Sequence, residues 1–332
     1  MKKVFITGGA GYVGSFLTDH LIENGYFVTV YDLFIYGENV FANKKNIDLI
    51  KGDIRNKELL NKSIKDHDIV IHLACISNDP SFELNPTLGK SINLDAFEPL
   101  VKISKENKVQ RFIYASSSSV YGIKEEKNVH EDVSLEPITD YSKFKAKCEV
   151  ILDNYSDDDF ITTTIRPATV CGYSRRLRLD LIVNILTNIA YHKKEITIFG
   201  GEQLRPNIHI KDMVRAYQTV MESPKDIVNK EIFNAGWENK SVNDIANIVK
   251  NTLGDDIKLI VSKTDDNRSY HISSEKIKNI LSFQTKFTNT DAIEDLKKAF
   301  ENKTFSEPLT NSNFFNIKKM QEIKLFLSLI HI

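Results

Sequence analysis

The stretch that decides the fold of this chain is residues 3–14, which read KVFITGGAGYVG. After Lys3, residues 4–7 are β-branched or aromatic, and residues 3–7 predict one buried strand of a parallel sheet. Glycines follow at once, and the apolar residues of positions 16–22 then recur with a helical period. A strand, a glycine-rich turn and a helix in this order are the setting in which a glycine motif predicts a dinucleotide-binding turn.

Three glycines of this turn have separate expected roles. Gly8 allows the tight turn, Gly11 lets a diphosphate approach the backbone, and Gly14 lets the helix pack closely on the strand. The N–H groups of Tyr12 and Val13, at the start of the helix, would hold the diphosphate where the helix dipole favours negative charge. The alternative is a glycine-rich turn without a ligand, and the next strand decides between the two.

That next strand ends in an acidic residue. Residues 27–31 read FVTVY, and Asp32 follows them about twenty residues after the glycines. A carboxylate at this position accepts hydrogen bonds from both hydroxyls of the adenosine ribose. No arginine follows directly to hold a 2′-phosphate. The sequence therefore predicts a dinucleotide cofactor and favours NAD over NADP.

The overall composition limits the partners of the chain. Its 332 residues carry 44 Lys and Arg against 45 Asp and Glu, a net charge of −1. We therefore expect neither a nucleic acid nor a membrane as a partner. Because the first predicted strand begins at residue 3, we expect no signal peptide, and Cys75, Cys148 and Cys171 show no metal-ligand spacing. We interpret the cysteines as buried, reduced thiols of a cytoplasmic protein that needs no metal.

Strand and helix patterns alternate through the first half of the chain. This alternation predicts an α/β fold with a doubly wound parallel sheet of the Rossmann type. We expect residues 1–166 to form an NAD-binding domain, which a strand near 231–235 rejoins. Residues 167–332 would mostly form a smaller, interleaved C-terminal lobe that binds the substrate.

Other predicted strands also end in residues suited to a ligand, because a doubly wound sheet binds its ligand at the carboxyl ends of its strands. Ordinary polar turns are the alternative at each of these places. The candidate residues are Asp53 and Ile54 after the third strand (facing adenine), Leu73, Ala74, Ser77 and Asn78 along and after the fourth, and Ser117 and Ser118 after the fifth.

Tyr141 and Lys145 lie four residues apart on a predicted helix, and so on one face of it. A phenol titrates near pH ~10, and a neighbouring ammonium group favours the phenolate, so we expect a lowered pKa for Tyr141. Tyr141 would then act as a general base that takes a proton from a substrate hydroxyl while hydride leaves the same carbon. This pair is common on amphipathic helices, and it gains weight only by following the glycine and serine turns.

These motifs, in this order, resemble the extended short-chain dehydrogenase/reductases that act on nucleotide sugars. The resemblance covers about residues 1–280, and it also includes Asn93, Arg166-Pro167, His209 and Asp212. It implies Ser117, Tyr141 and Lys145 as the catalytic residues. Ser117 would bind the reacting hydroxyl, and Tyr141 and Lys145 would also contact the cofactor, with Lys145 on the nicotinamide ribose.

The same resemblance implies cations for the diphosphate of the substrate. Arg205 and Arg268 match the positions that clamp it in the family. Residues 173–178, YSRRLR, are a basic cluster whose composition favours a solvated loop. The alternative is a basic rim for the diphosphate of a nucleotide sugar, with Arg178 as one of its contacts. Relatives pair the helices that carry Asn93 and Tyr141 across a dimer axis, so a homodimer is expected.

The reaction implied is NAD-dependent oxidation at C4 of a nucleotide-diphosphate sugar. The 4-keto species would either leave, as in a 4-dehydrogenase, or be reduced on its other face, as in a 4-epimerase. The 4,6-dehydratases of this fold carry Asp-Glu directly after the catalytic Ser or Thr, where this chain has Ser118 and Ser119. Dehydration is therefore the alternative, and it would require Glu83 or Glu125 to reach the site.

Two further interpretations concern the biological role. Residues 77–80 and 176–180 loosely resemble bacterial enzymes that oxidise GDP-heptoses for capsules, which suggests a role in surface-polysaccharide sugar synthesis. A non-catalytic NAD-sensing protein on this fold is the other possibility. Such a protein tends to lose the Tyr and Lys pair, which this chain keeps.

Overall fold

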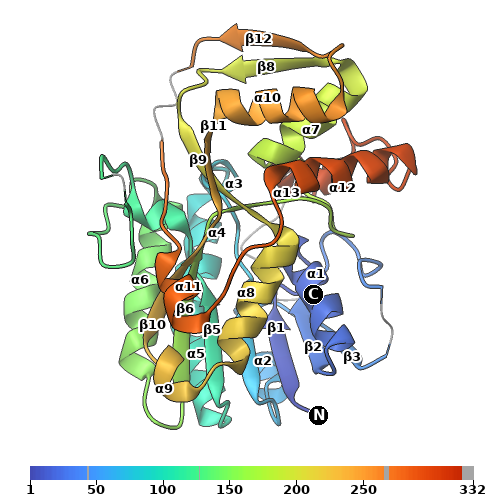
Figure 1. The fold of residues 1–332 in the computed structure, drawn as a ribbon. Helices are drawn as coiled ribbons and strands as arrows, with labels where there is room; N and C mark the ends of the chain where they lie inside the picture. Colours follow the sequence, from blue (N-terminus) through green and yellow to red (C-terminus); the bar gives the residue numbers. More distant parts are fainter. Residues whose placement is uncertain (43–44, 127, 265–268, 324–332) are drawn as a thin grey trace.

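The computed structural model describes residues 1–42, 45–126, 128–264 and 269–323 (Figure 1). Its central element is a sheet of seven strands in the order β10-β6-β5-β4-β1-β2-β3, and all neighbouring strands run parallel. The predicted α/β fold with a doubly wound sheet of the Rossmann type is confirmed. The strands are β1 (Lys3–Thr7), β2 (Phe27–Asp32), β3 (Ile47–Lys51), β4 (Ile69–His72), β5 (Arg111–Ala115), β6 (Ile161–Pro167) and β10 (Glu231–Ala235).

The direction of winding reverses between β1 and β4. The register pairs Thr7 with Tyr31 of β2 on one side and with His72 of β4 on the other. The pairing of β1 with β4 stops at Thr7 and His72. Strand β4 therefore ends at His72, although the apolar sequence continues to Cys75. The carboxyl ends of β1 and β4 therefore open the crevice where doubly wound sheets bind ligands.

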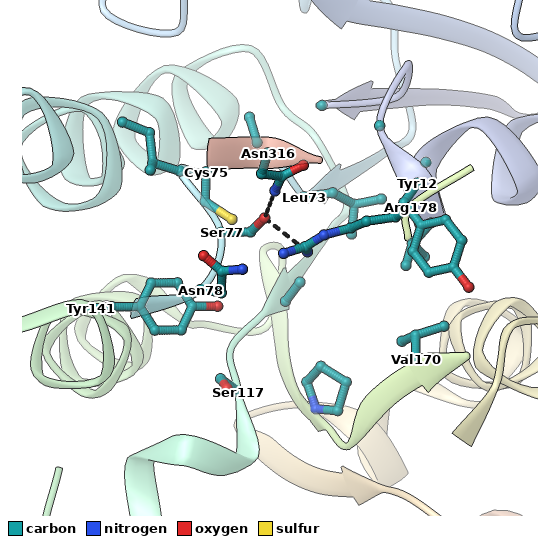
Figure 2. Close-up of a pocket in the computed structure, with 18 of the residues that line it drawn as sticks. Tyr12, Leu73, Cys75, Ser77, Asn78, Ser117, Tyr141, Val170, Arg178 and Asn316 are labelled. Atoms are coloured by element: carbon teal, nitrogen blue, oxygen red, sulfur yellow. Dashed lines mark hydrogen bonds between the residues drawn. The ribbon is translucent and has the colours of Figure 1, made fainter. Parts of the chain in front are cut away.

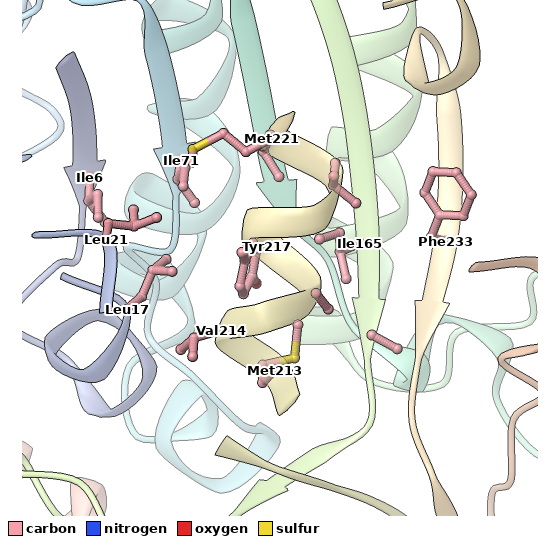
Figure 3. Packing of buried hydrophobic residues seen from close by; sticks show 14 of the residues in the cluster. Ile6, Leu17, Leu21, Ile71, Ile165, Met213, Val214, Tyr217, Met221 and Phe233 are labelled. Carbon is pink, nitrogen blue, oxygen red and sulfur yellow. The ribbon is translucent and has the colours of Figure 1, made fainter. Parts of the chain in front are cut away.

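Alternating side chains of each strand pack on opposite faces of the sheet. On β1, Val4 and Ile6 belong to one buried cluster and Phe5 to another. The first face is covered by α1 (Tyr12–Glu23), α8 (Ile210–Glu222) and α11 (Glu275–Leu281), and the second by α2 (Lys57–Ser63), α5 (Phe97–Glu106) and α6 (Asp140–Tyr155). Figure 3 shows Met213 and Tyr217 of α8 lying against the strands of the first face.

The second lobe lies above the sheet in Figure 1. It has a three-stranded sheet, β11-β9-β7, and a two-stranded sheet, β12-β8, with a core of its own. Its main elements are β7 (Thr169–Cys171), β8 (Glu195–Phe199), β9 (Leu204–His209), β11 (Glu238–Ser241), β12 (Lys258–Ser262), α7 (Ile182–Lys193), α10 (Val242–Leu253) and α12 (Asn289–Glu301). Because α8 and β10 return to the large sheet between these elements, the lobes interleave.

Short helices complete the described chain. They are α3 (Asp79–Glu83), α4 (Pro86–Lys90), a π-helical segment (Ser91–Asp95), a 3₁₀ turn (Ser118–Tyr121), α9 (Lys225–Val228), a second 3₁₀ turn (Ser312–Phe314) and α13 (Asn316–Ile323). Within the described ranges, no helix combines the length and the apolar character that a bilayer span requires.

Candidate active site

One cleft opens at the carboxyl edge of the sheet, with a volume of about 420 Å³ and walls from both lobes. Most of the site residues predicted from the sequence line it. They are Gly8, Gly11, Tyr12, Val13, Gly14, Asp32, Asp53, Ile54, Leu73, Ala74, Ser77, Asn78, Ser117, Ser118, Tyr141, Lys145 and Arg178. Arg205 does not line this cleft, and Arg268 lies outside the described residues.

The glycine turn leaves no room for side chains. Gly8 has a φ of +73°, and a Cβ on it would lie 2.6 Å from the backbone nitrogen of Ala74. A Cβ on Gly14 would lie 2.3 Å from the carbonyl oxygen of Gly8. Gly11 is the N-cap of α1, and neither a capping side chain nor an acidic residue occupies the first turn. The cradle therefore fits a diphosphate on the first N–H groups of α1.

Two acidic residues line the predicted nucleoside end of the cleft. Asp32 is fixed by the backbone N–H groups of Ala10 and Phe34, at 3.0 and 2.9 Å, and burial raises its pKa while these bonds oppose the rise. The carboxylate of Asp53 is instead bound by the Arg55 guanidinium at 2.6 Å. An ordinary turn thus accounts for the Asp53 side chain, whereas the Asp32 position fits a ribose.

The loop after β4 is held in an unusual conformation. Asn93, in the π-helical segment, donates to the carbonyl of Ile76 and accepts from its N–H, both at 2.9 Å. Asn78 has a φ of +72°, which is costly for a residue other than glycine. The Thr139 hydroxyl donates to Asp79 at 2.5 Å and so ties this loop to the start of α6. These bonds fix Ser77 and Asn78 in the cleft wall.

The three predicted catalytic residues line the same cleft, in which Figure 2 shows Ser117 and Tyr141. The buried ammonium group of Lys145 donates to the carbonyl of Ala115 at 2.6 Å and lies 5.8 Å from the ring centre of Tyr141. The hydroxyl oxygens of Ser117 and Ser119 are 2.9 Å apart. Helix α6 and the turn after β5 thus bring together a phenol, a hydroxyl and an ammonium group.

The expected lowering of the Tyr141 pKa is wrong for this structure. Burial raises the pKa of Tyr141, and the neighbouring Cys75 thiol and Asp79 carboxylate raise it further. The Arg178 guanidinium and the Ser117 hydroxyl oppose that rise. Burial of the phenol is the largest contribution to this shift, so Lys145 does not bring the pKa below its ordinary value.

The basic cluster is not the solvated loop that its composition favours. Arg176 and Arg178 are only 4% and 8% exposed. Arg178 donates to Asp180 at 2.6 Å and to the Ser77 hydroxyl at 3.1 Å. Apart from the exposed Arg175, the segment is buried or half-buried, and it is fastened to α1 by the Tyr12 hydroxyl, which donates to the carbonyl of the preceding Gly172 at 2.6 Å.

Several cleft residues were missed by the sequence analysis. Asn316 and Met320 come from α13, which begins about 160 residues after α6 ends, and no motif marks them. Cys75 was expected to be buried, but it is partly exposed and lines the cleft. Arg205 stacks on the ring of Tyr270, at 5.2 Å from its centre, and Tyr270 lines the cleft in its place.

Comparisons with known proteins agree on one family. The family model described as "NAD dependent epimerase/dehydratase family" matches residues 4–236. The chain is 27% identical to a UDP-glucose 4-epimerase of Lactobacillus helveticus, over 88% of this chain and 94% of that protein. It is 28% identical to the human dTDP-D-glucose 4,6-dehydratase, over 71% of this chain and 69% of that protein.

A solved structure shows the same architecture. The UDP-glucose 4-epimerase of Thermotoga maritima, crystallised with UDP-glucose, superposes with a TM-score of 0.83 at 26% identity and covers 91% of this chain and all of its own. The family model is described as NAD dependent, so the NAD cofactor predicted from the glycine turn and Asp32 is confirmed.

Proposed function

The chain belongs to the NAD-dependent epimerase/dehydratase family, and on that premise we propose that it oxidises C4 of a nucleotide-diphosphate sugar, as a 4-epimerase or a 4-dehydrogenase. The observation that carries this proposal is the meeting of Ser117, Tyr141 and Lys145 in one cleft with the glycine turn and Asp32. A sensor without catalysis would have no use for a buried phenol and ammonium pair at this place.

Each of the three residues has a proposed task. Tyr141 takes the proton of the C4 hydroxyl, Ser117 holds the oxygen of that hydroxyl, and Lys145 orients the nicotinamide ribose. NAD, when bound, supplies the acceptor for the hydride that leaves C4. Because the phenol is buried with a raised pKa, it also returns the proton readily when a 4-keto group is reduced. That property suits the reversible step of an epimerase.

The absence of a suitable acid pair supports oxidation without dehydration. Ser118 and Ser119 stand where dehydratases of this fold carry Asp-Glu, and a serine hydroxyl is neither a competent acid nor a competent base near neutral pH. Neither Glu83 nor Glu125 lines the cleft, and both are exposed. Asp79 is the one carboxylate among the described residues that both lines the cleft and acts on the pKa of Tyr141.

The experiment that tests this function is product analysis. Purified protein is incubated with NAD and a panel of UDP-, dTDP- and GDP-sugars, and the products are identified by mass spectrometry and chromatography. We expect either an isomer of unchanged mass or a product lighter by two hydrogens. A product lighter by one water, formed by the wild type and lost in Asp79→Asn, would contradict the proposal and assign Asp79 as the dehydrating residue.

The proposal extends to the role and assembly of the protein. We propose a function in bacterial surface-polysaccharide sugar synthesis, and the loose resemblance of residues 77–80 and 176–180 to GDP-heptose oxidising enzymes makes GDP-heptoses the first substrates to test. We also propose a homodimer through the helical segments that carry Asn93 and Tyr141, which is supported by Val150 of α6, whose surface is 65% exposed. Light scattering of the wild type and of Val150→Glu tests this, since the charged variant should be monomeric.

A further inference from the structure

Two buried guanidinium groups in the cleft are not used by the proposed reaction. Arg176 Nε and Arg178 Nη2 donate to no atom of the described residues, although both side chains are more than nine-tenths buried. Arg178 is paired with Asp180, but Arg176 forms no ion pair with any carboxylate in the described ranges. Asp32 and Asp180 act on Arg176 only from a distance, and a buried guanidinium that no carboxylate contacts is costly, so the site is built to receive an anion.

The fastening of this segment to α1 indicates which anion is received. The Ser174 hydroxyl donates to the carbonyl of Tyr12 at 2.9 Å, and its oxygen is 3.0 Å from that of Ser15. The two arginines are therefore carried past the first turn of α1, where the glycine turn leaves its N–H groups open. Arg176 also lies close enough to Asp32 to oppose the rise in its pKa, and its Cζ is 3.6 Å from the ring centre of Tyr36.

Asn316 of α13 connects both arginines. Its Oδ1 accepts from Arg176 Nη2 at 2.6 Å, and its backbone N–H donates to Asp180 at 2.9 Å. Its Nδ2 donates at 2.9 Å to the Ser77 hydroxyl, the same oxygen that accepts from Arg178 (Figure 2). Asn316 thus contacts Arg176 directly and reaches Arg178 through Ser77 and Asp180.

We propose that Arg176 and Arg178 bind the diphosphate of the dinucleotide, adding side-chain donors to the backbone N–H groups of α1, and that Asn316 is their positioning residue. The cofactor is then held by both lobes and by α13, and not by the Rossmann sheet alone. This proposal rests on the NAD site and is independent of the sugar and of the fate of the keto intermediate.

Titration calorimetry with NAD and with ADP-ribose, which keeps the diphosphate but lacks nicotinamide, tests the arginines. Arg176→Gln should raise the Kd of both ligands about tenfold or more, because a charge-assisted bond is lost. Arg175→Gln is the matched control: it removes the same charge one residue away, from an exposed side chain near Asp19, and should leave both Kd values within about twofold. Added salt should weaken NAD binding less in Arg176→Gln than in the wild type.

Binding of UDP distinguishes the diphosphate of the cofactor from the diphosphate of the nucleotide-sugar substrate. If Arg176→Gln weakens UDP binding and leaves NAD and ADP-ribose unchanged, the arginines serve the substrate and the proposal is overturned. Unchanged binding of all three ligands overturns it as well. Thermal unfolding checks that Arg176→Gln is folded. Arg176→Lys keeps the positive charge, so its affinity for NAD should lie between those of the wild type and Arg176→Gln. If Arg176→Gln does not fold, Arg176→Lys should still bind NAD more weakly than the wild type.

The role of Asn316 is tested by a double-mutant cycle. Asn316→Ala should weaken NAD binding, and the double variant Arg176→Gln/Asn316→Ala should bind NAD little more weakly than Arg176→Gln alone. Because Asn316 is proposed to act through the arginines, fully additive losses would contradict its positioning role. None of these measurements requires turnover, so they remain decisive if the proposed reaction is wrong.

Discussion

At the scale of single residues, the side chain proposed to select the cofactor and the one proposed to act on the substrate come from different elements of the cleft wall. Asp32 stands at the end of β2, where two N–H groups hold its carboxylate in place. Tyr141 stands across the cleft on α6, in surroundings that disfavour its anionic form. These two residues carry the first two predictions.

The first prediction concerns cofactor selectivity. A 2′-phosphate placed at Asp32 would be repelled by the carboxylate, so NAD should bind at least about tenfold more tightly than NADP. Asp32→Asn keeps the shape and removes the charge, and it should narrow that gap chiefly by improving the affinity for NADP. Calorimetry with both dinucleotides measures the effect. Equal Kd values in the wild-type protein would contradict the assignment.

The second prediction concerns pH. A raised pKa means that the Tyr141 phenol is protonated at neutral pH, so the fraction available as a base grows about tenfold per pH unit below that pKa. The rate of C4 oxidation should therefore rise with pH from neutral into the alkaline range. Tyr141→Phe should lower the rate by roughly 10²-fold or more and abolish this rise, while NAD binding persists. A Phe variant with the same pH profile would exclude Tyr141 as the base.

At the scale of elements, the catalytic helix is anchored to the sheet by a buried ion pair. Glu149 of α6 accepts from the Arg166 guanidinium of β6 at 2.6 and 3.0 Å, and Ser116 donates to the same carboxylate. Both charged side chains are nearly inaccessible. The pair therefore links the helix that carries Tyr141 to the strand that ends beside the cleft.

The third prediction follows from this pair. Glu149→Ala leaves Arg166 buried without its counter-ion and should lower the free energy of unfolding by about 3–5 kcal/mol. Glu106→Ala, which breaks the exposed Lys102–Glu106 pair one turn apart on α5, should cost only about 0.5 kcal/mol. Urea denaturation of both variants provides the comparison. Similar losses for the two variants would show that the buried pair is not an anchor.

The elements also show what a sequence can and cannot predict. The glycine turn and Asp32 were predictable because a turn and the strand end beside it are set by neighbouring residues. The burial of Arg176 and the arrival of Asn316 were not, because both depend on packing between segments far apart in the chain. The pKa of Tyr141 was misjudged for a related reason, since desolvation outweighs a neighbouring ammonium group and cannot be read from spacing.

At the scale of the whole molecule, the large sheet depends on residues from the second half of the chain. Met213, Tyr217 and Met221 of α8 and Phe233 of β10 pack in the same cluster as the first strands (Figure 3). We therefore propose that the two domains predicted from the sequence, residues 1–166 and 167–332, do not fold independently of each other.

The fourth prediction tests this dependence. A fragment of residues 1–166 lacks α8 and β10, whose buried apolar side chains contribute on the order of 10 kcal/mol, comparable with the whole stability of a domain. It should show no cooperative thermal transition and no NAD binding, in contrast to the full chain. A fragment that unfolds cooperatively and binds NAD would show that the first domain is autonomous.

The central claim, hydride transfer from C4 to NAD, is tested most directly by following a label. A nucleotide sugar deuterated at C4, chosen as the one that the protein converts, is mixed with the protein and NAD, and the reaction is stopped within one turnover. Mass spectrometry of the recovered cofactor should find reduced NAD that carries the deuterium in the wild type and none in Tyr141→Phe. Reduced cofactor without the label, or product formed while no label ever enters the cofactor, would contradict oxidation at C4.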